Sequence, residues 1–448
     1  MSEVPEVPAR PVAAGTEAAR TVAQPIDARA ATRGATAESA GRPRAVIVGG
    51  GIGGLTAAVA LRLRGWQVTV LERSRSLTPV GAGISLAPNA LRALDVIGMG
   101  EEIRGLAAWQ GDGGMRTPQG RWVSRTSASA LAERFGGPLV VVHRAELVAR
   151  LVARLPEDTV RTAAEARLAD PGDTARPALV ATADGGLEAE LVVGADGIHS
   201  GVRQALFPGH PGPVYSGFTT WRIVSPAPRQ AFDAHETWGR GRIWGTQPLK
   251  DGRIYAYGAA LAPAGQHAAD DERQELLRRF GDWHHPIPAL IAAAEPAHVL
   301  RHDVHHIAEP LPAFHRGRTV LLGDAAHAMP PTLGQGGNQA IEDAMVLAHH
   351  AGPDTVDLAA YSVARAPRTA AIARKAVQVA RIDMMTSRVG IAVRNAALAA
   401  LSKAGPELLL RSFDGIADWR PPQPPYASVE AVPATRPAGP EPVTGAGV

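Results

Sequence analysis

A glycine-rich stretch near the N-terminus constrains the fold of this chain more than any other feature. Residues 46–54 read V-I-V-G-G-G-I-G-G, so a short apolar run ends in glycines, and a helical pattern begins at Leu55. Gly49, Gly51 and Gly54 match the pattern G-x-G-x-x-G. The first glycine allows a sharp turn, the second lets backbone approach a pyrophosphate, and the third lets the helix pack on the strand. The stretch predicts the start of a βαβ unit that binds a dinucleotide at its helix N-terminus.

The residues that follow complete this unit. A second strand is predicted over residues 67–71, and it ends at Glu72, 18 residues beyond Gly54. An acid in this place can accept hydrogen bonds from a ribose hydroxyl. Because strand, helix and acid occur in the required order, we interpret the stretch as a dinucleotide site and not as a chance glycine-rich turn.

Composition limits the classes of protein that remain. The 448 residues exceed one ordinary domain and predict two joined lobes. There are no cysteines, which excludes disulfides, thiolate catalysis and Cys-ligated zinc. The net charge of +3, with no cluster of cations and aromatics, gives no reason to expect nucleic acid. No apolar run reaches about 18 residues, so we expect no membrane contact and a cytoplasmic protein.

Two further glycine-rich segments follow predicted strands. A strand over residues 187–193 leads into G-A-D-G-I-H-S-G-V-R at 194–203. A later buried strand ends at Asp324, and a Pro-Gly loop then leads to a second helix that begins near Gly336. The N-terminus of that helix offers free backbone N–H groups to something anionic or electron-rich.

An antiparallel sheet is predicted over residues 214–260, where alternating runs contain most of the aromatic residues. These rings could wall a pocket for a flat ligand or form a packed aromatic core. Arg222 lies among them, where it could neutralise an anionic substrate or point to solvent. A separate β-hairpin is predicted over residues 109–127. The aromatic residues concerned are Tyr215, Phe218, Trp221, Trp238, Trp244, Tyr255 and Tyr257.

Arg144 and several histidines leave alternatives open. Arg144 lies at a predicted helix start, where a cation is unfavourable, so either an anion lies nearby or the side chain is at the surface. His302, His305 and His306 lie on a strand-like run without a carboxylate partner, so we expect no metal site. His327 could act as a base on the substrate or support its loop from behind, and we favour support.

Three motifs in this order resemble one family. They are G-G-G-I-G-G with Glu72-Arg73, then G-A-D-G-I-H-S-G-V-R, and then G-D-A-A-H-A-M-P-P-T-L-G-Q-G-G-N. Over about residues 44–400 the chain is similar to single-component, class A FAD-dependent monooxygenases of the para-hydroxybenzoate hydroxylase type. Among these it resembles the short members, which are similar to salicylate hydroxylase, zeaxanthin epoxidase and FAD-dependent urate hydroxylase.

The resemblance implies an α/β (α+β) fold. A Rossmann-like FAD-binding domain is interleaved with an antiparallel-sheet substrate domain and followed by a C-terminal helix. The implied parts are a disordered N-terminal tail at 1–43, the FAD-binding domain at 44–213 with the substrate-lobe hairpin near 109–127 inserted in it, the substrate-binding sheet at 214–310, the second part of the FAD-binding domain at 311–356, a helical region at 357–415 and a Pro-rich disordered tail at 416–448.

The resemblance also implies which residues bind FAD. Along the chain they are Gly49, Gly51, Gly53 and Gly54 at the pyrophosphate, Glu72 at the adenosine ribose with Arg73 beside it, Gly83 and Ser85 in a loop flanking the flavin, Arg144, Asp196 and Gly197, Asp324 at the ribityl chain, Pro331, and Gly334, Gly336, Gly337 and Asn338 around the flavin pyrimidine. FAD is then the anion near Arg144, and the dipole of the second helix stabilises negative charge on the reduced ring. Arg222 is our candidate for a catalytic side chain.

The activity implied by the resemblance is insertion of one oxygen atom of O2 into an electron-rich aromatic or polyketide-like small molecule. NADPH or NADH reduces FAD, and O2 then gives a flavin C4a-hydroperoxide that the substrate attacks. The sequence has no second G-x-G-x-x-G unit, which fits a nicotinamide cofactor that binds transiently. The alternatives are an epoxidase of an isoprenoid or polyene alkene, and a flavin-binding protein without oxygenase turnover.

Two departures from related patterns narrow the expected chemistry. Thr332 stands where the urate hydroxylase type has an aspartate, so urate is not the expected substrate. The stretch T-W-R-I-V-S-P replaces the W-x-W-x-I-P of flavin halogenases, so halogenation is not expected. We expect a monomer or a homodimer.

Overall fold

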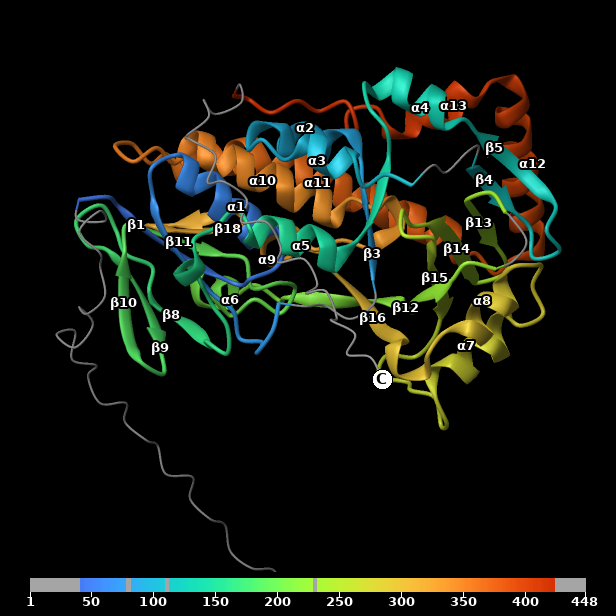
Figure 1. Cartoon of the computed structure of the whole chain (residues 1–448), viewed down its shortest axis with the longest axis horizontal. Helices are drawn as coiled ribbons and strands as arrows, with labels where there is room; N and C mark the ends of the chain where they lie inside the picture. The colour runs from blue at the N-terminus through green and yellow to red at the C-terminus, as the bar shows by residue number, and fades with distance from the viewer. Residues whose placement is uncertain (1–40, 78–81, 109–112, 229–231, 424–448) are drawn as a thin grey trace, which may run out of the picture.

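Two β-sheets of different kinds form the framework of the molecule (Figure 1). The computed structural model describes residues 41–77, 82–108, 113–228 and 232–423, so the expectations for residues 1–40 and 424–448 lie outside the described residues. The first sheet is parallel except for the pair β17–β18. In spatial order its strands are β17 (His315–Arg316), β18 (Thr319–Leu321), β11 (Leu191–Gly194), β1 (Arg44–Val48), β2 (Gln67–Leu71) and β7 (Val160–Arg161).

The central strands of this sheet bring their carboxyl ends to one edge. Val48 at the end of β1 lies level with Leu71 of β2 and with Gly194 of β11. The apolar residues 45–48 are all buried, as expected for a strand that neighbouring strands cover on both sides and helices cover on its face. The turns after β1, β2 and β11 therefore converge where open α/β sheets bind their ligands.

Helices from distant parts of the chain pack beside this sheet (Figure 1). The first, α1 (Ile52–Leu63), packs on α10 (Gly336–His350), which also contacts α2 (Pro88–Val96) and α11 (Leu358–Asp383). Gly53 lies at the crossing of α1 and α10, where a Cβ would come within 2.7 Å of Leu322 Cδ1 and 3.1 Å of Ala340 Cβ. The shorter elements here are α3 (Gly100–Arg104), α5 (Arg144–Val152), α6 (Gly201–Leu206) and the antiparallel strands β8 (Ala166–Asp170), β9 (Ala178–Thr182) and β10 (Gly185–Ala189).

The second sheet has seven strands and two different faces. Trp221 and Trp244 point to one face and pack against α7 (Glu272–Phe280) and α8 (Ile287–Ala293), so these two rings belong to the core on the side away from the first sheet. Arg222 and Tyr257 are register partners and point to the opposite face, toward the first sheet. The strands are, in spatial order, β16 (Leu300–Ile307), β12 (Pro213–Pro226), β15 (Arg253–Leu261), β14 (Arg242–Pro248), β13 (His235–Trp238), β4 (Gly113–Arg116) and β5 (Trp122–Thr126).

A two-stranded ribbon joins the two sheets. It pairs β3 (Gly83–Leu86) with β6 (Val140–His143) in antiparallel fashion. Gly83 lies directly against the ring of Tyr255, because a Cβ at this position would come within 2.5 Å of two ring atoms. The glycine thus lets a loop of the first lobe lie flat on an aromatic residue of the second.

The structure differs from the sequence predictions in three segments. Residues 187–193 are not one strand, because the chain changes direction near Glu190 and passes from the edge strand β10 into the central strand β11. The helical region predicted over 357–415 is divided into α11, α12 (Arg388–Ala404) and α13 (Pro406–Leu410). Residues 416–423, where the sequence predicts the start of a disordered tail, include the buried side chains of Ile416 and Ala417. None of the described helices is long and apolar enough to cross a bilayer.

A buried ion network fastens α10 to α11. Arg365, which is 1% exposed, donates to Asp343 Oδ1 at 2.6 Å and to Glu342 Oε2 at 2.6 Å. Arg368 adds a 2.8 Å bond to Glu342. Burial opposes ionisation of Asp343, but the charges of His327 and Arg365 outweigh it and hold the pKa of this carboxyl well below its usual range. The arrangement therefore keeps two carboxylates charged inside the protein.

We predict that Arg365→Met destabilises the protein by about 3–5 kcal/mol, because removal of one partner leaves buried carboxylates uncompensated. Thermal and urea unfolding would measure the loss. The matched control is Arg374→Met on the exposed side of the same helix, where the expected change is within about 0.5 kcal/mol. Equal effects of the two substitutions would contradict the assignment.

Candidate active site

The turn after β1 forms a cradle of backbone N–H groups. The first bond inside α1 runs from Leu55 N to Gly51 O at 2.9 Å, so the N–H groups of the three residues between them have no partner within the helix. Side chains at Gly49 and Gly54 are excluded, because a Cβ would overlap the backbone oxygen of Ala195 or of Gly49, respectively. A Cβ at Gly51 would meet nothing within 4 Å, so this glycine borders open space. The geometry suits a close approach of phosphate oxygens.

Glu72 closes one side of this cradle. Its Oε2 accepts from Gly50 N at 2.7 Å and its Oε1 from Ser74 N at 2.8 Å. Partial burial opposes the charge, but these bonds outweigh it and lower the pKa of Glu72. Arg73 is exposed beside it. The Glu72 carboxylate, which lies at the end of β2, therefore also holds the turn after β1 in place.

The segment after β11 supports the cradle from behind. Asp196 accepts from Ser200 Oγ at 2.5 Å and from Val202 N at 3.1 Å, so its carboxylate caps α6. Gly197 has φ +80°, and a Cβ on it would meet no atom within 4 Å, so the turn needs a glycine for conformation and not for space. Arg203 is buried and donates to Ala325 O at 3.0 Å, which ties this segment to α9 (Asp324–His327).

The N-terminus of α10 forms a second cradle. Its first helical bond runs from Gln339 N to Gln335 O at 2.8 Å, so the N–H groups of Gly336, Gly337 and Asn338 have no partner within the helix. Gly337 has no room for a side chain, because a Cβ would come within 2.7 Å of Ile84 Cδ1 in β3. These donors therefore lie close to the loop that holds β3.

The side chain of Asn338 does not point toward a ligand. It is 1% exposed, accepts from Ala87 N at 2.8 Å, and donates to Ser85 O at 2.9 Å and to Gly334 O at 2.6 Å. It therefore fastens the β3 loop to α10, and what it offers a cofactor is its backbone N–H. Pro331, at the start of a 3-10 turn, and Gly334, with φ +62°, shape the loop before α10.

Side chains from three elements meet between the two sheets. Asp324, Arg144 and His302 have exposed side chains, and the charge of Arg144 acts on both Asp324 and His302, so the three groups face one common space, which we call the cleft. Burial raises the pKa of Asp324, although the charges of His327, Arg144 and Arg222 oppose it. Burial lowers the pKa of Arg144, and Arg222 adds to that effect while Asp324 opposes it.

Arg222 connects this cluster to the face of the second sheet that carries Tyr255 and Tyr257, two rings that we call the tyrosine floor. It is partly exposed, and its charge and hydrogen bond act on the phenol of Tyr255, whose pKa burial nevertheless raises. Burial lowers the pKa of His302, and the charges of Arg222, Arg301 and Arg144 add to it. The cleft therefore carries a concentration of positive charge next to Asp324 and the N-terminus of α10.

His327 lies behind the loop and not in the cleft. It is 4% exposed, and its Nε2 is 2.6 Å from Asp343 Oδ2, which also accepts from Gly323 N at 2.8 Å. The prediction that His327 supports its loop from behind is therefore confirmed. Thr332 Oγ1 donates to Ala376 O at 2.7 Å and fastens the same loop to α11.

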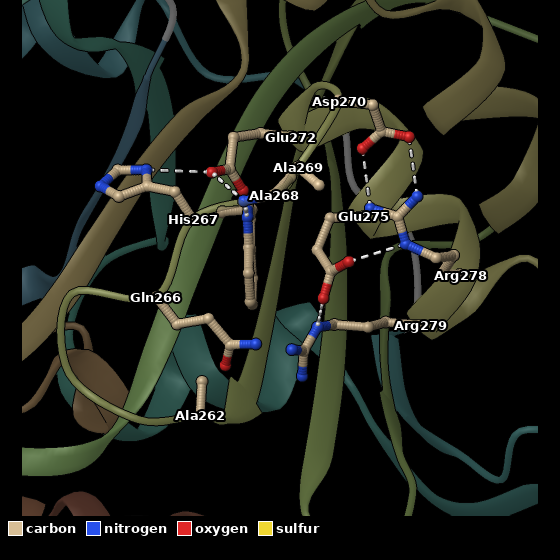
Figure 2. A pocket seen from close by; sticks show the side chains of 11 residues that line it. Ala262, Gln266, His267, Ala268, Ala269, Asp270, Glu272, Glu275, Arg278 and Arg279 are labelled. Carbon is tan, nitrogen blue, oxygen red and sulfur yellow. Dashed lines mark hydrogen bonds and ion pairs between the residues drawn. The ribbon is translucent and has the colours of Figure 1, made fainter. Parts of the chain in front are cut away.

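A hollow of about 540 Å³ lies elsewhere, at the far face of the second sheet beside α7 (Figure 2). Its charged groups are paired with one another: Arg278 bonds Asp270 at 2.8 Å, and Arg279 bonds Glu275 at 2.6 Å. The Trp221 indole N–H is also satisfied, by Glu272 at 2.7 Å. The charged pairs of this hollow are therefore already satisfied by one another, and the hollow is separate from the cleft.

The structure thus brings most of the predicted residues to one cleft, with exceptions. Gly53 lies at a helix crossing, and the side chains of Asp196 and Asn338 are used within the protein. Sequence reasoning missed side chains that carry no local motif and meet the site only through the tertiary fold. These are Asn89, Arg203 and Glu236 as site residues, His302 as a cleft residue, and Glu342, Asp343, Arg365 and Asp383. Tyr255 and Tyr257 are among the rings for which the sequence leaves open a pocket wall or a packed core.

Comparison with known proteins agrees with this geometry. A family model described as an FAD binding domain matches residues 43–376. The aurachin C monooxygenase/isomerase of Stigmatella aurantiaca is 40% identical over 314 residues, which cover 68% of this chain and 79% of that protein. The 3-amino-4-hydroxybenzoate 2-monooxygenase PtnB3 of Streptomyces platensis is 35% identical over 355 residues, covering 75% and 87%.

A solved structure has the same fold. HpxO of Klebsiella pneumoniae, in complex with FAD and uric acid, superposes with a TM-score of 0.75 at 29% identity, covering 84% of this chain and 96% of that one. The two glycine-lined helix N-termini described above provide the backbone donors that a dinucleotide with a flavin ring requires. The chain belongs to the FAD-binding family of flavin-dependent monooxygenases and hydroxylases, and FAD is its cofactor.

Proposed function

We propose that the protein is an NAD(P)H-consuming monooxygenase that inserts one oxygen atom of O2 into an electron-rich aromatic or polyketide-like small molecule. The observation that carries the proposal is the cleft itself, in which the N-terminus of α10 and Asp324 face Arg222 and a floor of tyrosine rings. The name of one relative, a 3-amino-4-hydroxybenzoate 2-monooxygenase, supports the aromatic substrate class.

The two cradles divide the work of binding FAD. We assign Gly49, Gly51 and Gly54 to the pyrophosphate and Glu72 to the adenosine ribose. At the other end, the N–H groups of Gly336, Gly337 and Asn338 and the carboxylate of Asp324 hold the flavin ring and its ribityl chain. Further donors and charges assigned to FAD are Arg73, Gly83, Ser85, Arg144, Asp196, Gly197 and Gly334.

The bound flavin supplies electron transfer from NAD(P)H and activation of O2. The protein's own residues orient the substrate and control charge. Backbone N–H groups at the start of α10 stabilise negative charge at the flavin edge without reorganisation. Arg222, held by Tyr255, neutralises negative charge that develops between cofactor and substrate. The tyrosine floor and the β3 loop exclude water from the reacting atoms.

The direct test is a panel of phenols, aminobenzoates and fused aromatics, assayed with NADH and with NADPH. We expect the purified protein to contain FAD, and we expect a true substrate to accelerate nicotinamide oxidation. Mass spectrometry with isotopically labelled O2 should find one labelled oxygen in the product. A polyene epoxide as the main product would support the epoxidase alternative. Bound flavin that neither nicotinamide reduces with any compound would support a protein without oxygenase turnover.

The first cradle predicts different effects at two glycines. Gly51→Val should leave the unfolding of the apoprotein unchanged, because the position has extended backbone and faces open space. It should raise the Kd for FAD at least about tenfold, since the new side chain occupies the phosphate site. Gly54→Val should instead lose folded protein, because its side chain would overlap Gly49 O. Thermal unfolding and flavin fluorescence titration measure both effects. FAD affinity unchanged in Gly51→Val would refute the assignment.

The charge of Arg222 gives a further prediction. Arg222→Met should lower kcat/KM about 10–100-fold with FAD still bound, the range expected when a hydrogen-bonded charge is removed. Tyr255→Phe, which keeps the ring over Gly83, should cost only about 3-fold. Steady-state kinetics measure both, and Arg253→Met, on an exposed arginine of the same strand as Tyr255, is the control. Unchanged kinetics in the Arg222→Met variant would remove Arg222 from the proposal.

A further inference from the structure

Asp383 is a buried carboxyl with no function in the scheme above. It ends α11, is 2% exposed, and its Oδ1 has no hydrogen-bond partner among the residues that the structure describes. Ala380 and Met384, on the same turn of the helix, belong to an apolar cluster on the second sheet against which Tyr257 packs. Asp383 therefore faces the second sheet on the side that carries Arg222. Buried polar atoms are nearly always paired, so an unpaired carboxyl oxygen needs an explanation.

Glu236 of β13 lies close to this carboxyl on the sheet. One Glu236 oxygen accepts from the Tyr257 hydroxyl, and the other accepts from Trp238 Nε1 at 2.9 Å. Both oxygens of Glu236 therefore act as hydrogen-bond acceptors. The ring of Tyr257 reaches Glu236 by lying flat over Gly245, where any Cβ would overlap the ring. The glycine at 245 thus gives Tyr257 the room that Gly83 gives Tyr255.

The surroundings of Asp383 favour its protonated form. Burial raises the pKa of Asp383 to about 8, and the charge of Glu236 adds to the effect while Arg394 opposes it. The other groups facing this pair are the phenol of Tyr257, whose pKa burial raises well above its usual value, and the guanidinium of Arg394, which packs on Trp238 with its centre 5.1 Å from the ring. Asp383 is therefore protonated at neutral pH.

The floor of the cleft connects these acids to the cationic cluster. The ring centroids of Tyr255 and Tyr257 are 5.8 Å apart, and Arg222 lies beside both. One end of the floor thus carries Arg144 and Arg222, and the other carries Glu236 and Asp383. A substrate that lies on this floor meets cations near the cofactor and hydrogen-bond acceptors at the far end.

We propose that Glu236 and Asp383 form a specificity site that selects neutral aromatic substrates presenting an N–H or O–H donor to the far end of the cleft, and that discriminates against benzoates presenting a carboxylate there. The proposal rests on the proposed function only in taking the tyrosine floor as the place where the aromatic substrate binds. A donor group would satisfy the free oxygen of Asp383, whereas a carboxylate would be placed next to the Glu236 carboxyl group. The neighbouring Arg394 guanidinium already packs on Trp238 and donates to Ile382 O at 3.1 Å.

The test is a binding measurement on the FAD-loaded protein, so it does not require turnover. The probes are 3-hydroxybenzamide and 3-hydroxybenzoate, which have nearly the same shape and differ in presenting an N–H donor or a carboxylate. Titration of the bound-flavin absorbance at pH 7 gives each Kd. We expect wild-type protein to bind the amide at least about tenfold more tightly, as one hydrogen bond to a charged or acidic group would give.

Variants separate recognition from a structural role. Asp383→Leu should raise the Kd of the amide about tenfold and leave that of the benzoate unchanged. Asp383→Asn, a neutral isostere of the protonated acid, should bind the amide within about threefold of wild type. Arg381→Leu, on the exposed side of the same turn, is the control and should change neither. Tighter binding of the benzoate, equal effects of Asp383→Leu on both probes, or no response of the flavin to either probe would overturn the proposal.

The pH dependence provides a second readout. Wild-type affinity for the amide should change above about pH 8, where Asp383 ionises, and Asp383→Asn should remove that change. A structural acid bridged by water would give the same pH profile in both proteins. Failure of the proposed function would show differently, as absence of an oxygenated product in the turnover assay whatever the order of the two dissociation constants.

Discussion

Both walls of the cleft depend on the ion pairs that the buried side chain of Arg365 forms with α10. Its guanidinium compensates Glu342 and Asp343, two adjacent carboxylates of α10 that are fully buried. Asp343 in turn binds Gly323 N and His327, which places the turn that carries Asp324. Without Arg365, the two buried carboxylates would keep only Arg368 and His327 as partners, and the lost compensation would cost more than most single contacts supply.

Glu342 extends the same network to the opposite wall. It accepts from Asn89 Nδ2 at 2.7 Å in α2, directly after the β3 loop. Asn338, one turn earlier on α10, fastens that loop through Ser85 and Ala87. The first turn of α10 is thereby held by polar bonds of defined direction on three sides. Apolar packing of equal strength would hold the helix but would leave the direction of its N–H groups less closely specified.

Sequence reasoning succeeds here where a constraint is local. The glycines at 49, 51 and 54 are fixed by a turn within one strand-helix unit, so their spacing, together with the strand, helix and acid around them, predicts the cradle. Sequence reasoning fails to predict to which sheet a segment belongs and to which face a side chain points, because both depend on strand register. Residues 187–193 are predicted as one strand, but the chain turns at Glu190 and places its two halves in different sheets. Aromatic content likewise predicts a sheet without saying that Trp221 and Tyr257 point to opposite faces. The missed site residues also depend on the tertiary fold. Only burial against α10 distinguishes Arg365 from the exposed Arg374. The pKa of Asp383 is raised by burial and by the charge of Glu236, which lies on a distant strand.

The distribution of charge along the cleft has a consequence for how a substrate lies in it. The cations Arg144 and Arg222 stand beside the N-terminus of α10, so three sources of positive potential act on the same end of the tyrosine floor. The Glu236–Asp383 pair presents carboxyl oxygens to the other end. A flat ring has little to distinguish its two ends by packing alone. In the function proposed above, polar groups at both ends of the floor therefore orient the substrate and decide which of its carbons faces the flavin.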